Sequence, residues 1–508
     1  MEAISKRSKL LPARDTHAVN VAKTYVSFTD NNTQTVYPTT PPGPGVREFV
    51  FQILPSVSSE LHPKSCKLIT SVRLLKENGD AIDSTAQVGI LNGFGATMWQ
   101  SIEVRINGVL WLPEFGFSDH ACYIKMLCAH SYRERHSLLN AVGWRTDTIG
   151  QTNSTKVELD PSCACICGKC PCVTKNDPTS GNSNCTPLTA TEIDKLSDFS
   201  VAEIKANQQA LVKFNQGLWI RAAMLKISRT SSVTVTTPLK FLHSFFDLCH
   251  YYPNRNTITV QLSLKEDKQI LCVKDGEASS IKYRLDITDI KLHLKYATFE
   301  QRIRLKWFES LSGTGLVRNF QAPKVVHFCM KKTTRNCRYA SIFNFSVVAN
   351  YFSIWFLTEK AHMGNFALNR FSYQCPDLQA VRVYKSGVPL SCNSLTSDMT
   401  ITKHSYHTSF WYQRFLEFFG EASYDITKEC FFEDVFLLNW NMGANPLLSG
   451  DKAITLDHEN RDLGPIDAGS IDVELEFRTA LSENVNVYFC AWMDAEVAFD
   501  NNGIPINL

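Results

Sequence analysis

The sequence predicts an all-β protein built from two β-sandwich modules in tandem. Apolar and polar residues alternate with period 2 over most of the chain after residue 46, helical spacing is confined to a few short stretches, and the order of elements occurs twice. At 508 residues the chain is too long for one ordinary domain. Its 44% hydrophobic and 20% charged residues exclude intrinsic disorder and coiled coil as the main architecture.

Residues 1–45 are expected to form an N-terminal arm. Basic residues exceed acidic ones in it, and it ends in residues 41–45 (PPGPG), an extended and semi-rigid spacer. Three interpretations stay open: a frayed terminus, a strap that reaches a neighbouring subunit, and a weak contact with nucleic acid. The arm lacks the apolar segment of a secretory signal. The most apolar stretch, residues 343–357, is too short and too polar to span a membrane, so we expect a soluble protein from a reducing compartment.

The strands of the first half are expected to be half-buried. Residues 101–106 alternate in polarity, and the Asn107-Gly108 pair that follows predicts a hairpin turn. The same alternation recurs in residues 257–264 and 292–296, the latter after an expected bulge at Thr288-Asp289. Each of these strands has one apolar and one polar face, which is typical of antiparallel sheets packed on one side.

The second half continues this pattern, and helix is a minority throughout. Residues 471–478 and 485–489 alternate in polarity close to the C-terminus. Apolar residues at helical spacing predict helices over residues 123–139, 410–419 and 202–212.

Six of the 17 cysteines gather inside a long polar insertion, residues 141–215. They are Cys163, Cys165, Cys167, Cys170, Cys172 and Cys185. Thiolates at such short spacing are candidate ligands of zinc or another soft metal ion. The alternative is a surface loop whose cysteines are free or oxidise after release from the cell, because the second pair of a zinc ribbon is missing. We assign no metal or cofactor, and no His/Asn partner suggests a catalytic thiol.

The order of elements repeats between the two halves. The first half has a strand, the Asn107-Gly108 turn, a short strand and then a helix. The second half has a strand, Ser386-Gly387, a short strand and then a helix. The repeat divides the chain into modules at residues 46–299 and 300–508. Short strands with long connections favour sandwiches over α/β folds, and an eight-stranded jelly roll leaves few exposed sheet edges.

No motif in the sequence predicts catalysis. Residues 312–315 (SGTG) lack the Lys-Ser/Thr of a phosphate-binding loop. A metal pair at His404 and His407 would lack a third ligand. Glu433 and Asp434 are carboxylates of the kind used in acid–base chemistry, but we place them on a strand, where adjacent side chains face opposite sides. We therefore predict that the protein is not an enzyme and has no catalytic residues.

The charge balance argues against a protein that coats nucleic acid. The chain has 52 basic and 50 acidic residues, whereas such proteins usually carry a large basic excess. The aromatic residues of 410–419 could stack on bases, but only Arg414 accompanies them, so we expect them to pack against protein.

Several longer motifs carry a resemblance to a known family. They are residues 485–494 (VNVYFCAWMD) with 497–500 (VAFD), 471–481, 425–438, 99–108 (WQSIEVRING), 123–139 and 143–147 (GWRTD). Together they resemble the double jelly-roll major capsid proteins of Maverick/Polinton elements and adintoviruses. The resemblance touches both halves of the chain.

The resemblance implies a capsid building block without catalytic residues or cofactor. Three copies would form a homotrimer of pseudo-hexameric outline, a hexon. Such trimers would assemble with neighbouring capsomers and a penton or minor capsid protein into an icosahedral shell around double-stranded DNA. The DNA would be contacted at most through the N-terminal arm, and residues 141–215 would form outward towers or clasp neighbours. The protein would be synthesised in the host cytoplasm, assembled in the host nucleus and located in the virion.

Two other functions remain open. A β-sandwich glycan- or receptor-binding module would bind one specific ligand and form no lattice. A hydrolase on a β scaffold would need acidic or histidine side chains that converge in one pocket, and the sequence offers no such set.

Overall fold

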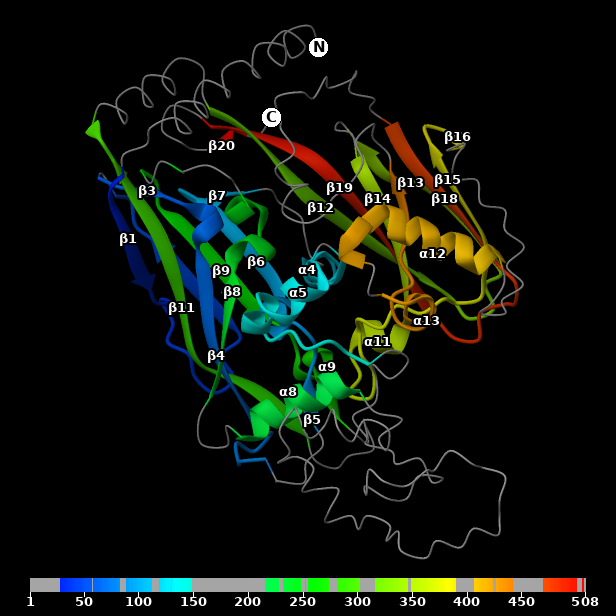
Figure 1. Ribbon diagram of the computed structural model, residues 1–508, viewed down its shortest axis with the longest axis horizontal. Helices are drawn as coiled ribbons and strands as arrows, with labels where there is room; N and C mark the ends of the chain where they lie inside the picture. The colour runs from blue at the N-terminus through cyan, green and yellow to red at the C-terminus, as the bar shows by residue number, and fades with distance from the viewer. Residues whose placement is uncertain are drawn as a thin grey trace, which may run out of the picture.

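The computed structural model describes most of both halves of the chain (Figure 1). The described residues are 28–56, 58–82, 88–111, 118–128, 130–148, 215–227, 232–247, 252, 255–273, 282–301, 316–345, 349–389, 406–423, 426–441, 469–499 and 505–506. The six clustered cysteines, the predicted helix over residues 202–212 and His404 lie outside this part.

The first half contains two main antiparallel sheets, ordered β1-β11-β4-β8 and β2-β9-β6-β7. The strands are β1 Phe28–Val36, β2 Glu48–Ile53, β4 Lys67–Lys76, β6 Trp99–Ile106, β7 Val109–Leu110, β8 Val233–Pro238, β9 Ile258–Leu264 and β11 Tyr283–Phe299. Shorter strands supplement them: β3 Glu60–Leu61 pairs with β11, and β5 Val88–Ile90 pairs with β10 Leu271–Val273. Residues 28–36 fall in the predicted arm and form an edge strand of the first sheet.

The second half contains two sheets of the same kind, ordered β12-β19-β14-β17 and β13-β18-β15-β16. The strands are β12 Leu316–Met330, β13 Asn336–Phe345, β14 Ala349–Thr358, β15 Leu378–Lys385, β16 Val388–Pro389, β17 Leu438–Asn441, β18 Gly469–Phe477 and β19 Val485–Phe499. A short strand, β20 Pro505–Ile506, pairs with β19.

The two halves share one topology. When the eight main strands of each half are numbered along the chain, one sheet has the order 1-8-3-6 and the other 2-7-4-5, in both halves. Two four-stranded antiparallel sheets connected in this Greek-key order form a jelly roll. The predicted all-β fold of two tandem jelly rolls is therefore confirmed.

Local turn chemistry fixes the matching hairpins. Asn107 and Gly108 have φ of 48° and 84°, the left-handed values that a two-residue type I′ turn requires. Ser386 and Gly387 repeat the turn in the second half, with φ of 50° and 78°. The predicted bulge near Asp289 is also present, as a register shift between Ile287 and Asp289 of β11.

The helices are short and lie in the chain segments that connect the strands of each half (Figure 1). They are α3 Phe94–Thr97, α4 Ser118–Cys128, α5 Tyr132–His136, α8 Gln216–Ile227, α9 Asp267–Ile270, α11 Glu359–Met363, α12 Tyr406–Phe419 and α13 Lys428–Glu433, with 3-10 turns η1 Pro63–Ser65, η2 Leu139–Val142, η4 Leu239–Phe241, η5 Ser244–Asp247 and η7 Gly420–Ser423. No helix in the described part of the chain has the length and apolarity that crossing a membrane requires.

One helix prediction is confirmed and another needs correction. The helix predicted over residues 410–419 is present as α12. The single helix predicted over residues 123–139 is wrong, because α4 ends at Cys128 and α5 begins after Ser131. The Ser131 side chain accepts from the backbone N–H of Glu134, and the Glu134 side chain accepts from that of Ser131. This capping box starts a new helix at Ser131.

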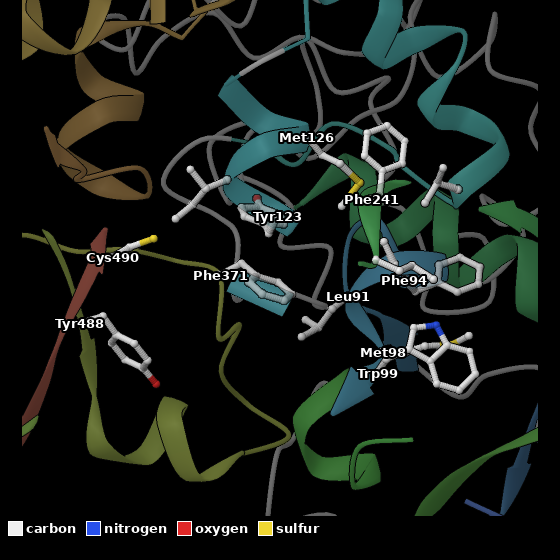
Figure 2. Packing of buried hydrophobic residues seen from close by; sticks show 14 of the residues in the cluster. Leu91, Phe94, Met98, Trp99, Tyr123, Met126, Phe241, Phe371, Tyr488 and Cys490 are labelled. Carbon is white, nitrogen blue, oxygen red and sulfur yellow. The ribbon is translucent and has the colours of Figure 1, made fainter. Parts of the chain in front are cut away.

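The alternation along each strand directs one face into a core. In β9, Ile258, Val260 and Leu262 are buried and the residues between them are half-exposed. In the second half, Phe343 of β13 and Phe352 of β14 meet with ring centroids 6.3 Å apart, so its two sheets face each other. Full burial of each such side chain contributes about 1.5–3 kcal/mol to stability. Figure 2 shows buried aromatic residues of both halves close together.

Candidate functional site at the junction of the two halves

Of the sequence-predicted site residues, the structure describes His407, Glu433 and Asp434. His407 lies in α12, whereas its proposed partner His404 lies outside the described residues. The prediction of a strand at Glu433 and Asp434 is wrong, because Glu433 ends α13 and Asp434 is the C-cap of that helix. The Asp434 carboxylate accepts a hydrogen bond from the Ser372 hydroxyl at 2.9 Å. Within the described ranges, no three His, Cys, Asp or Glu side chains are placed to hold a metal ion.

Three aromatic residues of α12 pack inside the protein, as the sequence predicted. Trp411, Phe415 and Phe419 are buried. Trp411 meets Trp440 of β17 with ring centroids 6.3 Å apart, and Phe415 meets Phe431 of α13 at 5.1 Å. These rings are therefore not available to stack on nucleic-acid bases.

The most concentrated group of buried charges lies where the two jelly rolls meet. We call it the junction cluster: Asp119 and His120 of α4, Lys265 after β9, and Arg370 and Tyr373 from the segment between α11 and β15. All five side chains are buried. The cluster combines residues of both halves and therefore connects one jelly roll to the other.

Asp119 is the centre of charge in the junction cluster. Its Oδ2 lies 2.6 Å from Lys265 Nζ and 3.3 Å from Arg370 Nη2. Lys265 Nζ also donates to the Thr97 carbonyl at 2.6 Å. Burial by itself would raise the pKa of Asp119, but Lys265 and Arg370 hold that pKa well below its usual range. Asp119 is therefore an anion that ties a lysine of the first half to an arginine of the second.

His120 is held in one neutral form by its partners. Arg370 Nη2 donates to His120 Nε2 at 3.3 Å, and since an arginine is always a donor, Nε2 carries no proton. The proton is then on Nδ1, which donates to the Tyr373 hydroxyl at 3.0 Å. Burial lowers the pKa of His120 to about 3 despite the attraction of Asp119. At neutral pH the ring is an uncharged connector between the halves.

Aromatic rings cover the junction cluster. The His120 ring lies over Tyr488 of β19, with centroids 5.0 Å apart. Tyr488 in turn stacks on Trp355 of β14 at 5.4 Å, with ring planes 9° apart. On the other side, Tyr123 of α4 stacks on Phe371 (Figure 2). These contacts exclude water, which strengthens the ion pairs inside.

The backbones of the two halves also touch. The Val273 amide at the end of β10 donates to the Phe366 carbonyl at 2.7 Å. Gly364, with φ of 89°, lies against α9, where an added Cβ would approach the Lys268 carbonyl oxygen to 3.1 Å. A glycine is needed here for both its left-handed conformation and the close approach.

The outer faces of the two equivalent sheets differ sharply. In the second half, Trp355 and Tyr488 are paired across β14 and β19 and lie buried beneath α4. The equivalent strands of the first half, β4 and β11, pair Lys67 with His293 and Ile69 with Lys291, and Lys67 is exposed. One face is thus covered within the chain. Among the described residues of its counterpart, Lys67 is exposed and Ile69 and Lys291 are half-exposed, and we call this counterpart the open face.

Sequence reasoning did not find the junction cluster. Asp119 and His120 precede the stretch predicted as helix. Lys265 begins the charged run 265–268 (KEDK), and Arg370 is a single charge between Asn369 and Phe371. The closest signal was the aromatic content of 11%, which predicted large cores or interfaces without assigning residues to them.

Comparison with solved structures identifies the fold. No family model matches the sequence, and no curated protein does either. A chain in the cryo-electron microscopy structure of the Sputnik virophage matches with a TM-score of 0.54 and 8% identity, over 94% of this chain and 89% of that chain. The Faustovirus major capsid protein matches with a TM-score of 0.47 and 9% identity, over 93% of this chain and 90% of that one. The mavirus major capsid protein matches with a TM-score of 0.44 and 12% identity, over 93% of this chain and 89% of that one. At these identities the likeness concerns the double jelly-roll fold alone.

Proposed function

We propose that the protein is the major capsid protein of a virus or virus-like element of the Maverick/Polinton and adintovirus type. The observation that carries this proposal is the repeated jelly roll. Two modules of one topology make up most of the described residues, and a chain in the structure of the Sputnik virophage matches over 94% of the full chain. The buried junction supports a building-block role, because buried charged side chains of both modules pair there.

The capsomer is a homotrimer of pseudo-hexameric outline in this proposal. Three copies of a chain with two jelly rolls present six similar modules around one axis. The open outer face of β4 and β11, with Lys67, Ile69 and Lys291, would contact the next copy. The equivalent face of the second half is already covered by α4, so covering both faces gives every module a similar environment.

The mass of the protein in solution tests the trimer. Light scattering on the purified full chain should give about 170 kDa, since three chains of 57.3 kDa associate. Negative-stain images should show hexagonal rings or shells. A stable monomer that binds a glycan in a screen, and that forms no particles, would replace the proposal with the glycan- or receptor-binding module.

Charge reversal on the open face gives a sharper version of this test. Lys67→Glu with Lys291→Glu should shift the mass towards the monomer. Arg105→Glu on β6 is the matched control, because it reverses a surface charge on the outer face of the other sheet. Equal trimer content in all three proteins would exclude the β4–β11 face as the contact.

The remaining parts of the assembly follow from this role. We propose jelly rolls over residues 46–299 and 300–508, with β1 added to the first, and a shell completed by neighbouring capsomers and a penton or minor capsid protein. The near-neutral chain would contact packaged DNA at most through its N-terminal arm. We propose the virion as its location, with synthesis in the host cytoplasm and assembly in the host nucleus. No catalytic activity is part of the proposal.

The arm has its own test. Deletion of residues 1–27 leaves β1 in place and should preserve the fold of both jelly rolls. Weaker assembly of the shortened chain would support a strap between subunits. Unchanged yield and stability of particles would count against it.

A further inference from the structure

The repeated topology places a helix after the fifth strand of each jelly roll. In the first half this helix is α4, which follows β7, and in the second half it is α12, which follows β16. Each half also presents the outer face of its 1-8-3-6 sheet. Within the chain, α4 covers the face of the second half, where the rings of His120 and Tyr488 lie 5.0 Å apart. The open face of the first half and the outer side of α12 are left over.

α4 and α12 differ in how much of their surface is covered. Residues 119–128 of α4 include no exposed side chain, because the first half contacts one side of the helix and the second half the other. In α12, Trp411 and Phe415 are buried against the second half itself, one turn apart. Gln413 and Glu417 lie on the opposite side of the helix and are exposed. α12 therefore has an outward side that α4 does not have.

The open face carries a row of basic side chains. Lys291, His293 and Lys295 alternate with buried residues along β11, so their side chains lie on the outer face of the sheet. Lys67 of β4 is paired with His293 in register. Lys291 forms an ion pair with Asp289, whereas Lys67 and Lys295 are exposed and have no ion-pair partner among the described residues. The face is complementary to a surface that presents a carboxylate.

We propose that α12 of one copy covers the open face of the next copy in the trimer, with Glu417 against the basic side chains of that face. This inference rests on the function proposed above. Within one chain, α12 lies apart from β4 and β11 (Figure 1), so the contact joins two copies. It is a head-to-tail contact, because the helix of one copy meets a different surface of the next. Three such contacts close a ring.

The proposed contact repeats between copies what the junction does within a copy. In both places the helix after the fifth strand of one jelly roll lies on the outer sheet face of the following jelly roll. The covered face differs in chemistry: that of the second half presents Trp355 and Tyr488, and the open face presents lysines. An exposed polar side on α12 matches the basic face, just as the buried α4 matches the aromatic one.

Charge reversal at α12 tests this contact on the purified full chain. Glu417→Lys should raise the concentration at which half of the protein is trimeric by about tenfold or more, because like charges then meet across the interface. Addition of Lys67→Glu and Lys291→Glu to this variant should recover most of the trimer, since opposite charges face each other again in every contact. Sedimentation over a range of concentrations measures the trimer content. Glu48→Lys is the matched control, because Glu48 is an exposed carboxylate on the outer face of β2, and it should assemble as the wild type does.

Cross-linking with a carbodiimide provides a second measurement that needs no variant. The reagent takes up the water lost when a glutamate carboxylate and a lysine amine condense to an amide, and it joins only groups at ion-pair distance. In trimers assembled from isotope-labelled and unlabelled chains, Glu417 should be linked to Lys67, Lys291 or Lys295 of a differently labelled chain. Mass spectrometry of the digested protein identifies the linked peptides.

The outcomes separate this inference from the capsid proposal. Trimers of unchanged strength in Glu417→Lys would overturn the α12 contact and leave the trimer itself intact. The same conclusion follows if the combined variant recovers no trimer, or if Glu417 is cross-linked only within its own chain. A wild type that stays monomeric at every concentration would overturn both the contact and the trimer.

Discussion

Tyr123 of α4 and Phe371 stack face to face across the junction, with ring centroids 4.4 Å apart and ring planes 8° apart. One ring comes from each half of the chain, and both are buried. Nearby, the Asp119 carboxylate forms an ion pair with Lys265 of the first half and with Arg370 of the second. The junction therefore combines aromatic packing with a desolvated ion pair, and the two contributions can be tested separately.

The aromatic contribution is accessible to a double-mutant cycle. Tyr123→Leu and Phe371→Leu should each destabilise the protein, and the pair should show a coupling energy of about 0.5–1.5 kcal/mol beyond the sum of the single effects. Urea unfolding of the four proteins measures it. Tyr132→Leu combined with Phe371→Leu is the control, since Tyr132 is exposed on α5. Strict additivity for the first pair would show that the stacking adds nothing beyond burial.

The ionic contribution centres on Asp119. Asp119→Asn removes the anion and leaves Arg370 as a buried cation without this counter-charge, while the pKa of Lys265, which burial already lowers to about 7, falls further. Unfolding should therefore become easier by about 3–5 kcal/mol. Chemical denaturation at pH 7 measures the change. Asp289→Asn is the matched control, because Asp289 pairs with Lys291 at the surface at 2.9 Å, and its loss should have little effect. Similar stability of the two variants would contradict the assigned role of Asp119.

Stability should fall as the solution becomes mildly acidic. Burial lowers the pKa of His120 to about 3 and that of His243 to about 4. Between pH 6.5 and 4 the unfolded chain binds protons that the folded chain does not, so the free energy of unfolding decreases by about 1.4 kcal/mol per pH unit for each group. Urea unfolding at pH 7 and pH 5.5 measures the slope. His243→Gln should reduce the slope by the contribution of one group, about 1.4 kcal/mol per pH unit. An unreduced slope would argue against a buried neutral His243.

Gly143 is required for its shape as well as its conformation. Its φ is 84°, and an added Cβ would overlap the ring of Phe94. Gly143→Ala should destabilise the first jelly roll by about 1–3 kcal/mol through overpacking in addition to backbone strain. Gly108→Ala is the control: it has the same φ of 84° with nothing within 4 Å of an added Cβ, so only about 1 kcal/mol of strain is expected. Thermal unfolding of both variants distinguishes the two effects.

Metal binding by the six clustered cysteines stays a prediction, because these cysteines lie outside the described residues. If they bind zinc, reduced protein should carry close to one metal ion per chain, and Cys167→Ser with Cys170→Ser should release it. Elemental analysis of the purified protein measures the ratio. Cys66→Ser, a buried cysteine elsewhere, is the control for loss of a thiol. Well-folded protein without metal would leave the free or oxidised loop as the explanation.

The fold class, the repeat and the hairpins could be predicted from the sequence. Period-2 alternation in residues 257–264 determines which face of β9 is buried, and Asn107-Gly108 determines a turn with positive φ at both positions. These features depend on neighbours along the chain, so they can be read from it. The break between α4 and α5 was missed because the capping box of Ser131 and Glu134 competes with an otherwise continuous helical pattern.

How the two jelly rolls pack against each other could not be predicted from the sequence. Asp119, Lys265 and Arg370 are far apart in the sequence, and each resembles an ordinary surface charge until packing excludes water around all three. The same holds for Trp355 and Tyr488, whose outward-facing rings are buried by α4 rather than by their own core. Periodicity specifies which side of a strand is apolar, whereas the partner that covers it depends on contacts between distant segments, which no local pattern encodes.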